Sequence, residues 1–433
     1  MIIERKKYLD KLISKKDNGL IKVITGIRRC GKSFLLFELY HAYLNTVGVT
    51  DDCIIEIALD EAANAKYKNP FMLDQYVREL TSDKTKRFYV FIDEVQLVIE
   101  MQNPYIDGVE DKIGFVPVLL GLMRLKNVDL YVTGSNSKML STDILTEFKD
   151  RGDEVKVNPL SFKEFYDAYE GDKHRAWQEY FTYGGMPFVV SKKTPEEKSK
   201  YLKELFTKTY ITDVIERNKI NNDKDILEDL LNILSSAIGS LTNPSKLSKT
   251  FQSVKNIHIS SSTISKYIDY FTEAYIVNKA ERYDIKGKKY MGTPLKYYFT
   301  DVGLRNARLN FRQMEENHIM ENIIYNELMS RGFNVDVGVV EYNHKDEKGK
   351  KIRSQLEVDF VVNSGSNRYY IQSALSVADE EKRQQEINSL KRVADSFKKI
   401  VVVKDAIIPW YDEDGIFYIG IEQFLLDENS IHM

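Results

Sequence analysis

The stretch Gly26-Ile27-Arg28-Arg29-Cys30-Gly31-Lys32-Ser33-Phe34 decides the fold, because its first eight residues fit the pattern G-x-x-x-x-G-K-[ST]. Glycine at both ends lets the backbone turn so that its N–H groups surround a phosphate. Lys32 supplies a positive charge, Ser33 offers a hydroxyl to Mg²⁺, and the positive end of the following helix faces the anion. A tight glycine turn with a solvated lysine is the alternative. The apolar run before the motif and the amphipathic run after it favour a nucleotide phosphate site at residues 26–34.

Two acids follow a second apolar run. Residues 88–92 are all apolar, and Asp93 and Glu94 come directly after them. Such a run is typical of a central strand in a parallel sheet, and ligands bind at the carboxyl ends of these strands. We expect Asp93 to hold Mg²⁺, directly or through water, and Glu94 to polarise the attacking water. A solvated strand end would explain the acids alone, but their position about 60 residues after the loop favours the catalytic role.

A further strand-like stretch, residues 128–133, is followed by Gly134-Ser135-Asn136. A polar side chain at this strand end could sense the γ-phosphate or orient water. We expect Ser135 or Asn136 to do so. Gly, Ser and Asn are also favoured in turns, so turn chemistry is an equal alternative.

Apolar runs and amphipathic stretches alternate through the first part of the chain. Strands are expected at residues 22–25, 53–59, 88–92 and 128–133, and helices at residues 33–43, 70–81 and 117–125. This order predicts βαβ units and an α/β fold with an open parallel sheet. The first two helices are expected to turn these residues inward: Leu35, Leu36, Leu39, Leu73, Tyr76, Val77 and Leu80.

The composition is that of an ordinary globular protein. The chain has 433 residues, 43% of them hydrophobic and 29% charged, with a formal net charge of −3, so only a local basic patch could meet a polyanion. Two cysteines are too few for a disulfide framework. The amino end lacks the order of a signal peptide, and the longest apolar stretch, residues 113–123, is shorter than a membrane span of about 20 residues. We therefore expect a cytoplasmic protein without a membrane partner.

One local basic patch is present, because residues 240–299 hold nine lysines and one arginine against four acids. A helix is expected after residues 260–263, where serine or threonine provides an N-cap, followed by a strand at 275–282 and a basic turn at 285–289. The helix is expected to bury Ile264, Tyr267, Ile268 and Phe271. This order resembles a winged helix, in which the second helix enters the major groove of duplex DNA and the wing contacts phosphate. A helical module with a solvated basic rim is the alternative.

The motifs together resemble an AAA+ ATPase core of the kind common in bacteria and archaea, over residues 1–215. The family pattern is I-x-R, G-x-R-R-x-G-K-S, hydrophobic-D-E, T-G-S-x-S, P-L-S-F-x-E-F and G-G-M-P, matched here at residues 3–5, 26–33, 93–94, 133–137, 159–165 and 184–187. The resemblance implies that the chain binds ATP and Mg²⁺ and hydrolyses ATP.

In similar proteins a Gly-Arg dipeptide shortly before P-L-S-F supplies an arginine finger. Here Asp150-Arg151-Gly152 stands at that place, so Arg151 matches while the preceding glycine is replaced. A finger that acts on the nucleotide of a neighbouring subunit would imply a homo-oligomer. A surface ion pair of Arg151 with Asp150 or Asp153 is the alternative.

The carboxyl-terminal part, residues 311–433, returns to mixed α and β structure. Helices are expected at residues 316–330 and 379–397, strands at 356–362, 368–372 and 399–403, and a hairpin loop at 343–351. This order resembles the uncharacterised domain that often follows such AAA+ cores, and its central part resembles a PD-(D/E)XK nuclease fold.

A nuclease of that kind needs an Asp and a Glu on adjacent strands to hold Mg²⁺, and a Lys to position water. Asp359 fits the first acid, with Glu321 as a helper on a helix. Gln372 stands at the place of the second acid, and Ala374 at the place of the lysine. The resemblance therefore implies a degenerate, noncatalytic module. Simple alternation on a half-exposed strand is the alternative for Asp359.

These inferences give four segments: an AAA+ P-loop ATPase core (1–160), a helical extension (161–221), a winged-helix-like module (222–310) and a nuclease-like domain (311–433). The expected function is Mg²⁺-dependent ATP hydrolysis coupled to the binding of duplex DNA. Two alternatives stay open. One is a noncatalytic protein in which ATP only sets the conformation of the basic module, and the other is an ATP-regulated metal-dependent nuclease.

Overall fold

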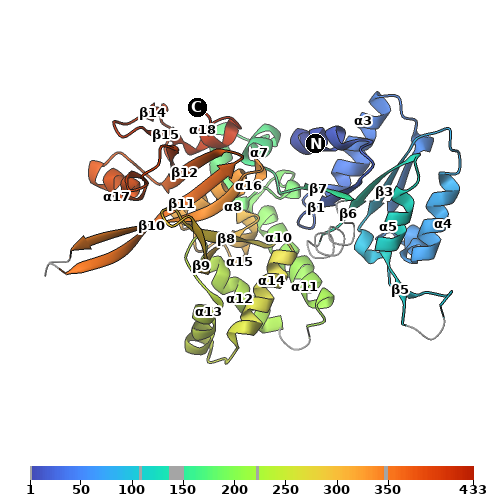
Figure 1. Ribbon diagram of the computed structural model, residues 1–433, viewed down its shortest axis with the longest axis horizontal. Coiled ribbons are helices and arrows are strands. Elements are labelled where there is room, and N and C mark those ends of the chain that lie inside the picture. Colours follow the sequence, from blue (N-terminus) through green and yellow to red (C-terminus); the bar gives the residue numbers. More distant parts are fainter. Residues whose placement is uncertain (1, 107–109, 136–150, 221–223, 346–349) are drawn as a thin grey trace. The chain divides into compact units, whose positions relative to one another are not determined.

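The computed structural model describes residues 2–106, 110–135, 151–220, 224–345 and 350–433 (Figure 1). The chain divides into two compact units. Unit 1 extends to Pro159 and includes Glu273–Tyr275, and unit 2 comprises Leu160–Thr272 and Ile276–Met433. Of the helices in the described ranges, none combines the length and the apolar character that a membrane crossing requires.

Unit 1 alternates strands and helices, as the hydrophobic pattern predicts. Its elements are α1 (Lys6–Lys15), β1 (Ile21–Thr25), α2 (Lys32–Phe34), the π-helical segment η1 (Leu35–Tyr40), α3 (His41–Thr46), β2 (Ile54–Ala58), α4 (Pro70–Leu80), β3 (Phe88–Asp93), β4 (Met101–Gln102), β5 (Lys112–Ile113), α5 (Phe115–Met123), β6 (Val128–Thr133) and β7 (Gly152–Lys156).

The described residues of unit 1 form a parallel five-stranded sheet in the order β2-β3-β6-β1-β7. Every residue of β1, β3 and β6 is buried, because helices cover both faces. One face packs on α4 and α5, which lie together in Figure 1, through a core that includes Leu73, Val77 and Leu119. The predicted α/β fold with an open parallel sheet is thus confirmed.

Two details of unit 1 differ from the expected helix faces. Leu39 is only half-buried, and Tyr40 is fully buried beside Phe91 and Tyr131. The π-helical turn of η1 rotates the residues after Leu36, which a regular 3.6-residue period does not anticipate. Leu80, the last residue of α4, is 42% exposed.

Unit 2 begins with helices and ends with a mixed sheet. Its helices are α7 (Phe162–Ala168), α8 (Ala176–Tyr183), α9 (Pro187–Val190), α10 (Pro195–Leu205), α11 (Thr212–Arg217), α12 (Lys224–Ser236), α13 (Pro244–Thr250), α14 (Ser261–Glu273), α15 (Val302–Arg308), α16 (Glu316–Ser330), α17 (Glu380–Lys391) and α18 (Ile421–Leu426). Its strands are β8 (Val277–Asp284), β9 (Lys289–Phe299), β10 (Asn334–Lys345), β11 (Lys351–Ser364), β12 (Asn367–Ala374), β13 (Lys398–Val403), β14 (Trp410–Tyr411) and β15 (Ile416–Gly420).

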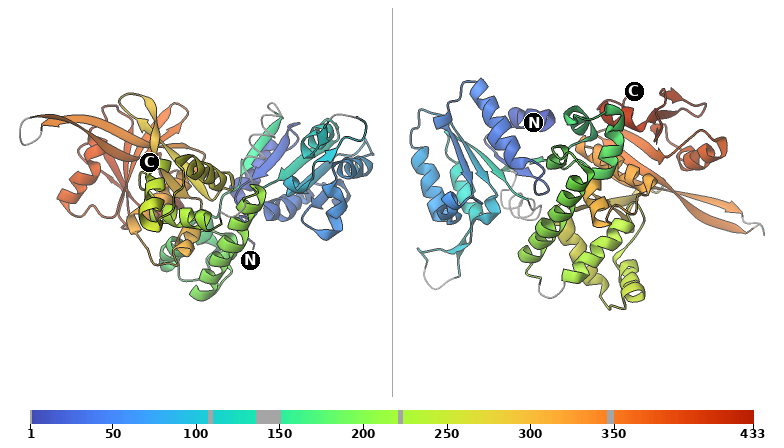
Figure 2. Two further views of the ribbon diagram at one scale, coloured as in Figure 1. Left: turned by 90° about the horizontal axis from the view of Figure 1, so that it is seen from below. Right: turned by 180° about the vertical axis from the view of Figure 1, so that it is seen from behind.

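The described strands of unit 2 form one eight-stranded sheet in the order β14-β15-β13-β12-β11-β10-β8-β9. Helix α16 contacts β9, β10, β11 and β12, whereas α17 contributes Ile387 and Leu390 to a core with Val358, Tyr370 and Val401. The antiparallel hairpin of β10 and β11 extends beyond its neighbouring strands in both views of Figure 2, and its outer residues are exposed.

The expected boundary near residue 310 does not separate two compact units. Strand β8 pairs with β9 on one side and, in parallel, with β10 on the other. The strand and basic turn expected to form the wing of a winged helix therefore lie in β8 and the β8–β9 turn, at the end of the carboxyl-terminal sheet. Helix α14 itself follows the prediction: Ser260 Oγ accepts a hydrogen bond from the Thr263 N–H at 3.0 Å. The four residues expected on its inner face are buried: Ile264, Tyr267, Ile268 and Phe271.

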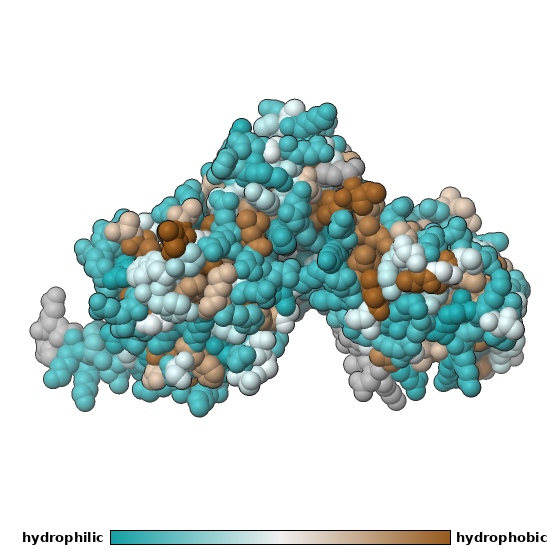
Figure 3. All heavy atoms as spheres, turned by 90° about the horizontal axis from the view of Figure 1, so that it is seen from above, coloured by the Kyte–Doolittle hydropathy of each residue, from teal (hydrophilic) through white to brown (hydrophobic). Residues whose placement is uncertain are grey.

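On the face that Figure 3 shows, the described residues are mostly hydrophilic, and hydrophobic side chains emerge in scattered groups. Scattered exposed apolar residues are normal for a globular protein and carry no functional conclusion.

Candidate functional site

The loop between β1 and α2 has the backbone that a phosphate cradle requires. Gly26 has a φ of 137° and Gly31 a φ of 98°, and a Cβ built on Gly26 would lie 2.0 Å from the Val157 carbonyl oxygen. A side chain at position 26 is therefore excluded both by conformation and by space. Arg29 also has a positive φ, of 64°. The loop follows the carboxyl end of a central strand, where ligands bind in open α/β sheets.

Lys32 lies folded against this loop. Its Nζ donates to the carbonyl oxygens of Gly26 at 3.0 Å and Ile27 at 3.3 Å, and the residue is only 4% exposed. The ammonium group is thus held inside the turn that surrounds the phosphate position. Since α2 begins at Lys32, the first N–H groups of the helix face the same position.

Arg5 fastens the loop to the strand end beside it. Its Nη1 donates to the Cys30 carbonyl oxygen at 2.9 Å and its Nη2 to the Asn158 carbonyl oxygen at 2.6 Å. Arg5 is 4% exposed and precedes α1 with a φ of 46°. The I-x-R motif at residues 3–5 was the sequence signal for this contact, and the structure gives it a physical role.

The thiol of Cys30 is enclosed. Its Sγ lies 3.3 Å from the Val157 carbonyl oxygen, and the side chain is fully buried. Burial raises the pKa of the thiol, although Lys32 and Arg5 oppose the shift. These facts favour an inert filler over a reactive thiolate.

Asp93 is the last residue of β3, and its carboxylate joins the loop to β6. Ser33 Oγ donates to Asp93 Oδ2 at 2.7 Å, and Thr133 Oγ1 donates to Asp93 Oδ1. Burial raises the pKa of Asp93, while the hydrogen bonds from Thr133 and Ser33 lower it. The adjacency of Ser33 and Asp93, expected from their spacing, is present. Thr133 is a site residue that the sequence analysis did not single out.

Glu94 lies one residue further, in the left-handed conformation with a φ of 53°. Its backbone N–H donates to Thr133 Oγ1 at 3.0 Å, so one hydroxyl contacts both acids. Gln96 Nε2 donates to Glu94 Oε2, and Ser135 Oγ lies 3.4 Å from the same oxygen. Gln96 Oε1 is buried without a hydrogen-bond partner among the described residues.

The expected Ser135 therefore lies beside Glu94. The other expected residue at this strand end, Asn136, lies outside the described residues.

The oxygen donors at this site fit Mg²⁺. A hydroxyl and a carboxylate, from Ser33 and Asp93, lie together next to the phosphate position. Mg²⁺ is usually bound by one or two such groups together with water and substrate phosphates. Ser33 and Asp93 would hold the ion there.

Arg151 lies away from this edge of the sheet. It precedes β7, an edge strand that the polar run Gly152–Lys156 did not lead us to predict, and its carbonyl oxygen accepts from the Ile21 N–H. Because β7 runs parallel to β1, Arg151 stands at the amino ends of both strands. The loop at residues 26–33 follows the carboxyl ends, roughly 16 Å away along the strands. The side chain is exposed.

Within unit 2, the three residues expected at a degenerate nuclease site do come together. Asp359 accepts a hydrogen bond from the Ser373 N–H at 2.8 Å and donates its own N–H to Gln372 Oε1 at 3.3 Å. Burial and the nearby charge of Glu321 raise the pKa of Asp359 well above its usual value.

A lysine that the sequence analysis did not assign occupies the centre of this cluster. Lys296 Nζ lies 2.7 Å from Glu321 Oε1 and 2.6 Å from Glu357 Oε1, and the residue is 3% exposed. Its ammonium group stands between the carboxylates that a metal would need. In the ranges that the structure describes, no group of three or more His, Cys, Asp or Glu side chains could hold a metal ion. This cluster does not fit a nuclease metal.

The basic segment at residues 240–299 is partly neutralised. Ion pairs engage Lys255 with Asp229, Lys279 with Asp269, and Lys296 with Glu321. The lysines that remain exposed are Lys246, Lys249 and Lys266 on the helices, and Lys286, Lys288 and Lys289 at the β8–β9 turn. A smaller basic surface is left than the sequence predicts.

Two family models match the chain. Residues 18–166 match the family described as "AAA domain", a range that contains the glycine loop, both acids and Thr133. Residues 174–315 match a "Domain of unknown function (DUF8612)". Unit 1 thus contains the part of the chain that matches the AAA domain family, and its parallel sheet has the α/β fold of a P-loop nucleotide-binding protein.

Relatives that match nearly all of this chain come from a bacterium and an archaeon. A Haemophilus influenzae protein is 32% identical over 434 residues, which covers 98% of this chain and 99% of the relative. A Methanocaldococcus jannaschii protein is 27% identical and covers 95% of this chain and 85% of its own length. Both carry the description "uncharacterized protein".

Solved structures show weaker likeness. A Walker-type ATPase of Pyrococcus abyssi matches 71% of this chain and 96% of its own, with a TM-score of 0.48 and 15% identity. The ORC2 protein of Aeropyrum pernix, solved with ADPNP and ADP, matches 72% of this chain and 95% of its own length, with a TM-score of 0.27 and 10% identity.

Proposed function

The chain belongs to the family of its Haemophilus influenzae relative, and we propose that it hydrolyses ATP with Mg²⁺ at the loop of residues 26–33. The observation that carries this proposal is the continuous hydrogen-bonded path Ser33–Asp93–Thr133–Glu94. It joins the phosphate loop to both acids across three adjacent strands of one sheet.

Each residue of this path has a role in the proposal. The backbone N–H groups of the loop and Lys32 bind the β- and γ-phosphates, while Ser33 and Asp93 hold the ion. Mg²⁺, when bound, neutralises charge that develops on the phosphate oxygens. Glu94 orients and polarises the attacking water, with its carboxylate held by Gln96. The unpartnered Gln96 Oε1 offers that water a second acceptor.

The test is steady-state phosphate release by the wild type and by Glu94→Gln, with ATP affinity measured in parallel. We expect Glu94→Gln to bind ATP as the wild type does and to hydrolyse it at least about 100-fold more slowly, because a positioned general base contributes about that much. Glu79→Gln, an exposed glutamate of α4 in the same unit, is the matched control and should keep the wild-type rate. An unchanged rate in Glu94→Gln would refute the role of Glu94. If the wild type binds ATP but does not hydrolyse it, the result would favour the alternative of a noncatalytic protein whose conformation is set by ATP.

We also propose that ATP hydrolysis is coupled to duplex DNA through the exposed lysines of unit 2. The observation behind this second proposal is the β8–β9 turn, in which Lys286, Lys288 and Lys289 are all exposed. DNA cleavage is not part of the proposal, because the ammonium of Lys296 fills the acidic cluster.

The DNA proposal predicts salt-dependent binding. The logarithm of the association constant should fall against the logarithm of salt concentration with a slope of about −0.9 per phosphate contact. In a triple variant, with Lys286, Lys288 and Lys289 changed to Gln, the slope should become less negative by about two to three units, because up to three phosphate contacts are lost. The control changes three exposed lysines elsewhere in unit 2, Lys163, Lys193 and Lys200, to Gln. No salt dependence in the wild type, or equal losses in both triple variants, would contradict the proposal.

A further inference from the structure

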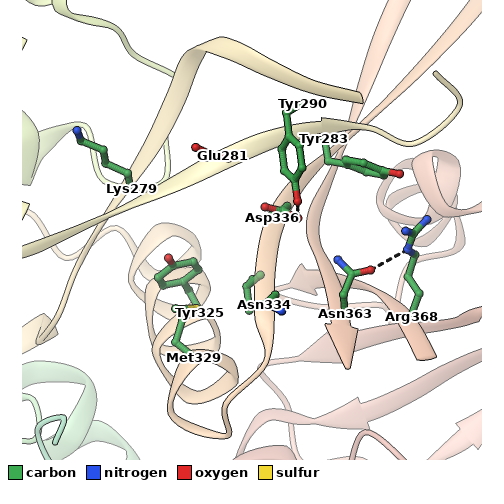
Figure 4. Close-up of a pocket in the computed structure, with 11 residues that line it drawn as sticks. Lys279, Glu281, Tyr283, Tyr290, Tyr325, Met329, Asn334, Asp336, Asn363 and Arg368 are labelled. Carbon is green, nitrogen blue, oxygen red and sulfur yellow. Dashed lines mark hydrogen bonds between the residues drawn. The ribbon is translucent and has the colours of Figure 1, made fainter. Parts of the chain in front are cut away.

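A pocket of about 480 Å³ opens in unit 2, formed by β8, β9, β10, α16 and the ends of β11 and β12 (Figure 4). Its lining includes none of Lys296, Glu321 and Asp359, so it is separate from the acidic cluster described above. The lining combines aromatic rings, amides and charges of both signs. Pockets with a few convergent polar groups and aromatic walls are typical small-molecule sites.

One side of the pocket carries a carboxylate that the protein itself satisfies poorly. Asp336 is 9% exposed, and its Oδ2 accepts a hydrogen bond from the hydroxyl of Tyr290 at 3.2 Å (Figure 4). Among the described residues Asp336 makes no ion pair with a lysine, arginine or histidine. A carboxylate offers about four acceptor positions, and a buried one normally has several filled. Asp336 therefore has acceptor capacity left for N–H donors of a ligand.

Two tyrosine rings stand beside this carboxylate. The rings of Tyr283 and Tyr290 lie 5.4 Å apart at 64°, and Tyr290 is 59% exposed despite its large apolar surface. Tyr325 of α16 lines the opposite wall. Planar heterocycles stack favourably on such rings, and this contact suits nucleobases in particular.

A cation lies at one end of the same pocket. The Arg368 guanidinium lies 5.2 Å from the centre of the Tyr283 ring, and its Nε donates to Asn363 Oδ1 at 2.9 Å. Arg368 forms no ion pair with a carboxylate within the part of the chain that the structure describes, although its charge acts on Asp336 and its side chain hydrogen-bonds to Tyr370 and Tyr283. Guanidinium groups in this state bind phosphate oxygens well.

A ligand that satisfies all three features has a flat ring with N–H donors and an attached anion. A diamine or a guanidinium ligand would bind Asp336 but would be repelled by Arg368. Inorganic phosphate would bind Arg368 but would be repelled by Asp336. We propose that this pocket binds a nucleotide whose base carries an amino group, with the base against Tyr283 and Asp336 and the phosphate at Arg368. The nucleotide is either free or a unit of a nucleic-acid strand. This site is distinct from the ATP loop of unit 1.

Guanine matches the carboxylate best, because its N1–H and amino group can donate side by side to one carboxylate. Thymine presents carbonyl oxygens on both sides of its single N–H, and these would face Asp336 unfavourably. The proposal thus predicts a preference of at least tenfold for dGMP over dTMP.

The test is calorimetric titration of the full-length protein with dGMP, dTMP, deoxyguanosine and a guanine pentanucleotide. The same titrations in Lys32→Ala exclude binding at the ATP loop, because monophosphates that occupy unit 2 bind this variant unchanged. Loss of dGMP binding in Lys32→Ala would overturn the pocket assignment. A pentanucleotide that binds more tightly than dGMP identifies a strand as the source, and equal affinity identifies a free nucleotide.

Two variants test the individual contacts. Asp336→Asn should lower the affinity for dGMP at least tenfold and remove the preference for dGMP over dTMP. Its matched control is Asp395→Asn, since Asp395 also accepts from a tyrosine hydroxyl, that of Tyr370, but lies outside the pocket. Arg368→Gln should weaken the binding of dGMP while leaving the affinity for deoxyguanosine unchanged. A folding defect would weaken the binding of both. The proposal fails if no probe binds saturably, if dTMP binds as tightly as dGMP, or if Asp336→Asn and Asp395→Asn behave alike.

Discussion

Thr133 links the two acids of the proposed ATP site through a single hydroxyl. Its Oγ1 donates to Asp93 and accepts from the Glu94 N–H. The hydroxyl therefore fixes the orientation of the carboxylate expected to hold Mg²⁺ and the backbone of the residue expected to polarise water. Removing it would leave a buried carboxylate oxygen and a backbone N–H with one hydrogen bond fewer.

We expect Thr133→Val to lower the rate of ATP hydrolysis by about 10- to 100-fold, corresponding to about 1.4 to 2.7 kcal/mol. Valine has nearly the shape of threonine, so ATP affinity should change little. Thr81→Val is the matched control, because Thr81 is also buried in unit 1 but donates to the Val77 carbonyl oxygen, away from the site. Phosphate release at the wild-type rate in Thr133→Val would mean that the hydroxyl does not organise the acids.

Cys30 provides a second test at the scale of one residue. Because its thiol is fully buried and burial raises its pKa, it should react with a disulfide reagent only after unfolding, whether or not ATP is present. Cys53 is also buried, so both thiols should become reactive together in denaturant. Rapid labelling of Cys30 in the native protein would contradict this expectation and indicate a reactive thiolate in the loop.

The residues of the glycine loop and the two acids were predictable because their chemistry constrains both residue type and spacing. Thr133 was not, although it ends a predicted strand. Its role depends on the register between β3 and β6, which pairs Ile92 with Val132 and so brings the two strand ends together. No pattern within one strand reveals such a register. Arg151 matched a motif by position, but the direction of β7 places it at the opposite edge of the sheet.

At the scale of elements, one buried acid ties a loop to a helix in unit 2. Asp301 precedes α15 and accepts from the Leu304 N–H at 2.9 Å and from the Gly185 N–H at 2.6 Å. It thereby joins α15 to the G-G-M-P loop at residues 184–187. Burial raises the pKa of Asp301 to about 6, although backbone hydrogen bonds from Gly185, Leu304 and Gly303 oppose the shift.

This shift makes the contribution of Asp301 to stability depend on pH. The folded state holds the proton more tightly than the unfolded state does, so the contribution is largest below about pH 4 and is lost as the pH rises to about 6. Asp301→Asn stays neutral throughout. The unfolding free energy of the wild type minus that of the variant should therefore decrease, by on the order of 3 kcal/mol, between pH 4 and pH 7.

Denaturant unfolding of both proteins across this pH range measures the difference. Asp379→Asn is the matched control, because Asp379 also caps a helix, α17, but is exposed. A difference that increases with pH would show that the hydrogen bonds to Asp301 outweigh its burial.

Helices and strands were predicted correctly from the spacing of apolar residues where that spacing was regular. Helix α16 has the predicted bounds, and the strands of the parallel sheet lie where apolar runs placed them. Strand β7 escaped prediction because its sequence, Gly152–Lys156, is largely polar, as edge strands often are. The π-helical turn of η1 was not predicted, because it changes the number of residues per turn within one helix.

At the scale of the whole chain, the sequence predicted the α/β fold of the amino-terminal part correctly, whereas strand pairing crosses the segment boundary expected near residue 310. Composition and motif order suggested a basic module that ends near residue 310. The pairing of β8 with β10 makes β8 and β9, within residues 277–299, part of the carboxyl-terminal sheet. Long-range strand pairing of this kind is decided by tertiary packing, which local patterns do not contain.

The central claim for the whole molecule is that the glycine loop of unit 1 binds the triphosphate of ATP. The most direct measurement is a calorimetric titration of the full-length protein with ATP and Mg²⁺, repeated with Lys32→Ala and with Lys126→Ala, an exposed lysine of the same unit. We predict saturable binding by the wild type and by Lys126→Ala, and an affinity at least tenfold lower in Lys32→Ala, a loss of about 1.4 kcal/mol or more. Equal ATP affinities in all three proteins would contradict the account.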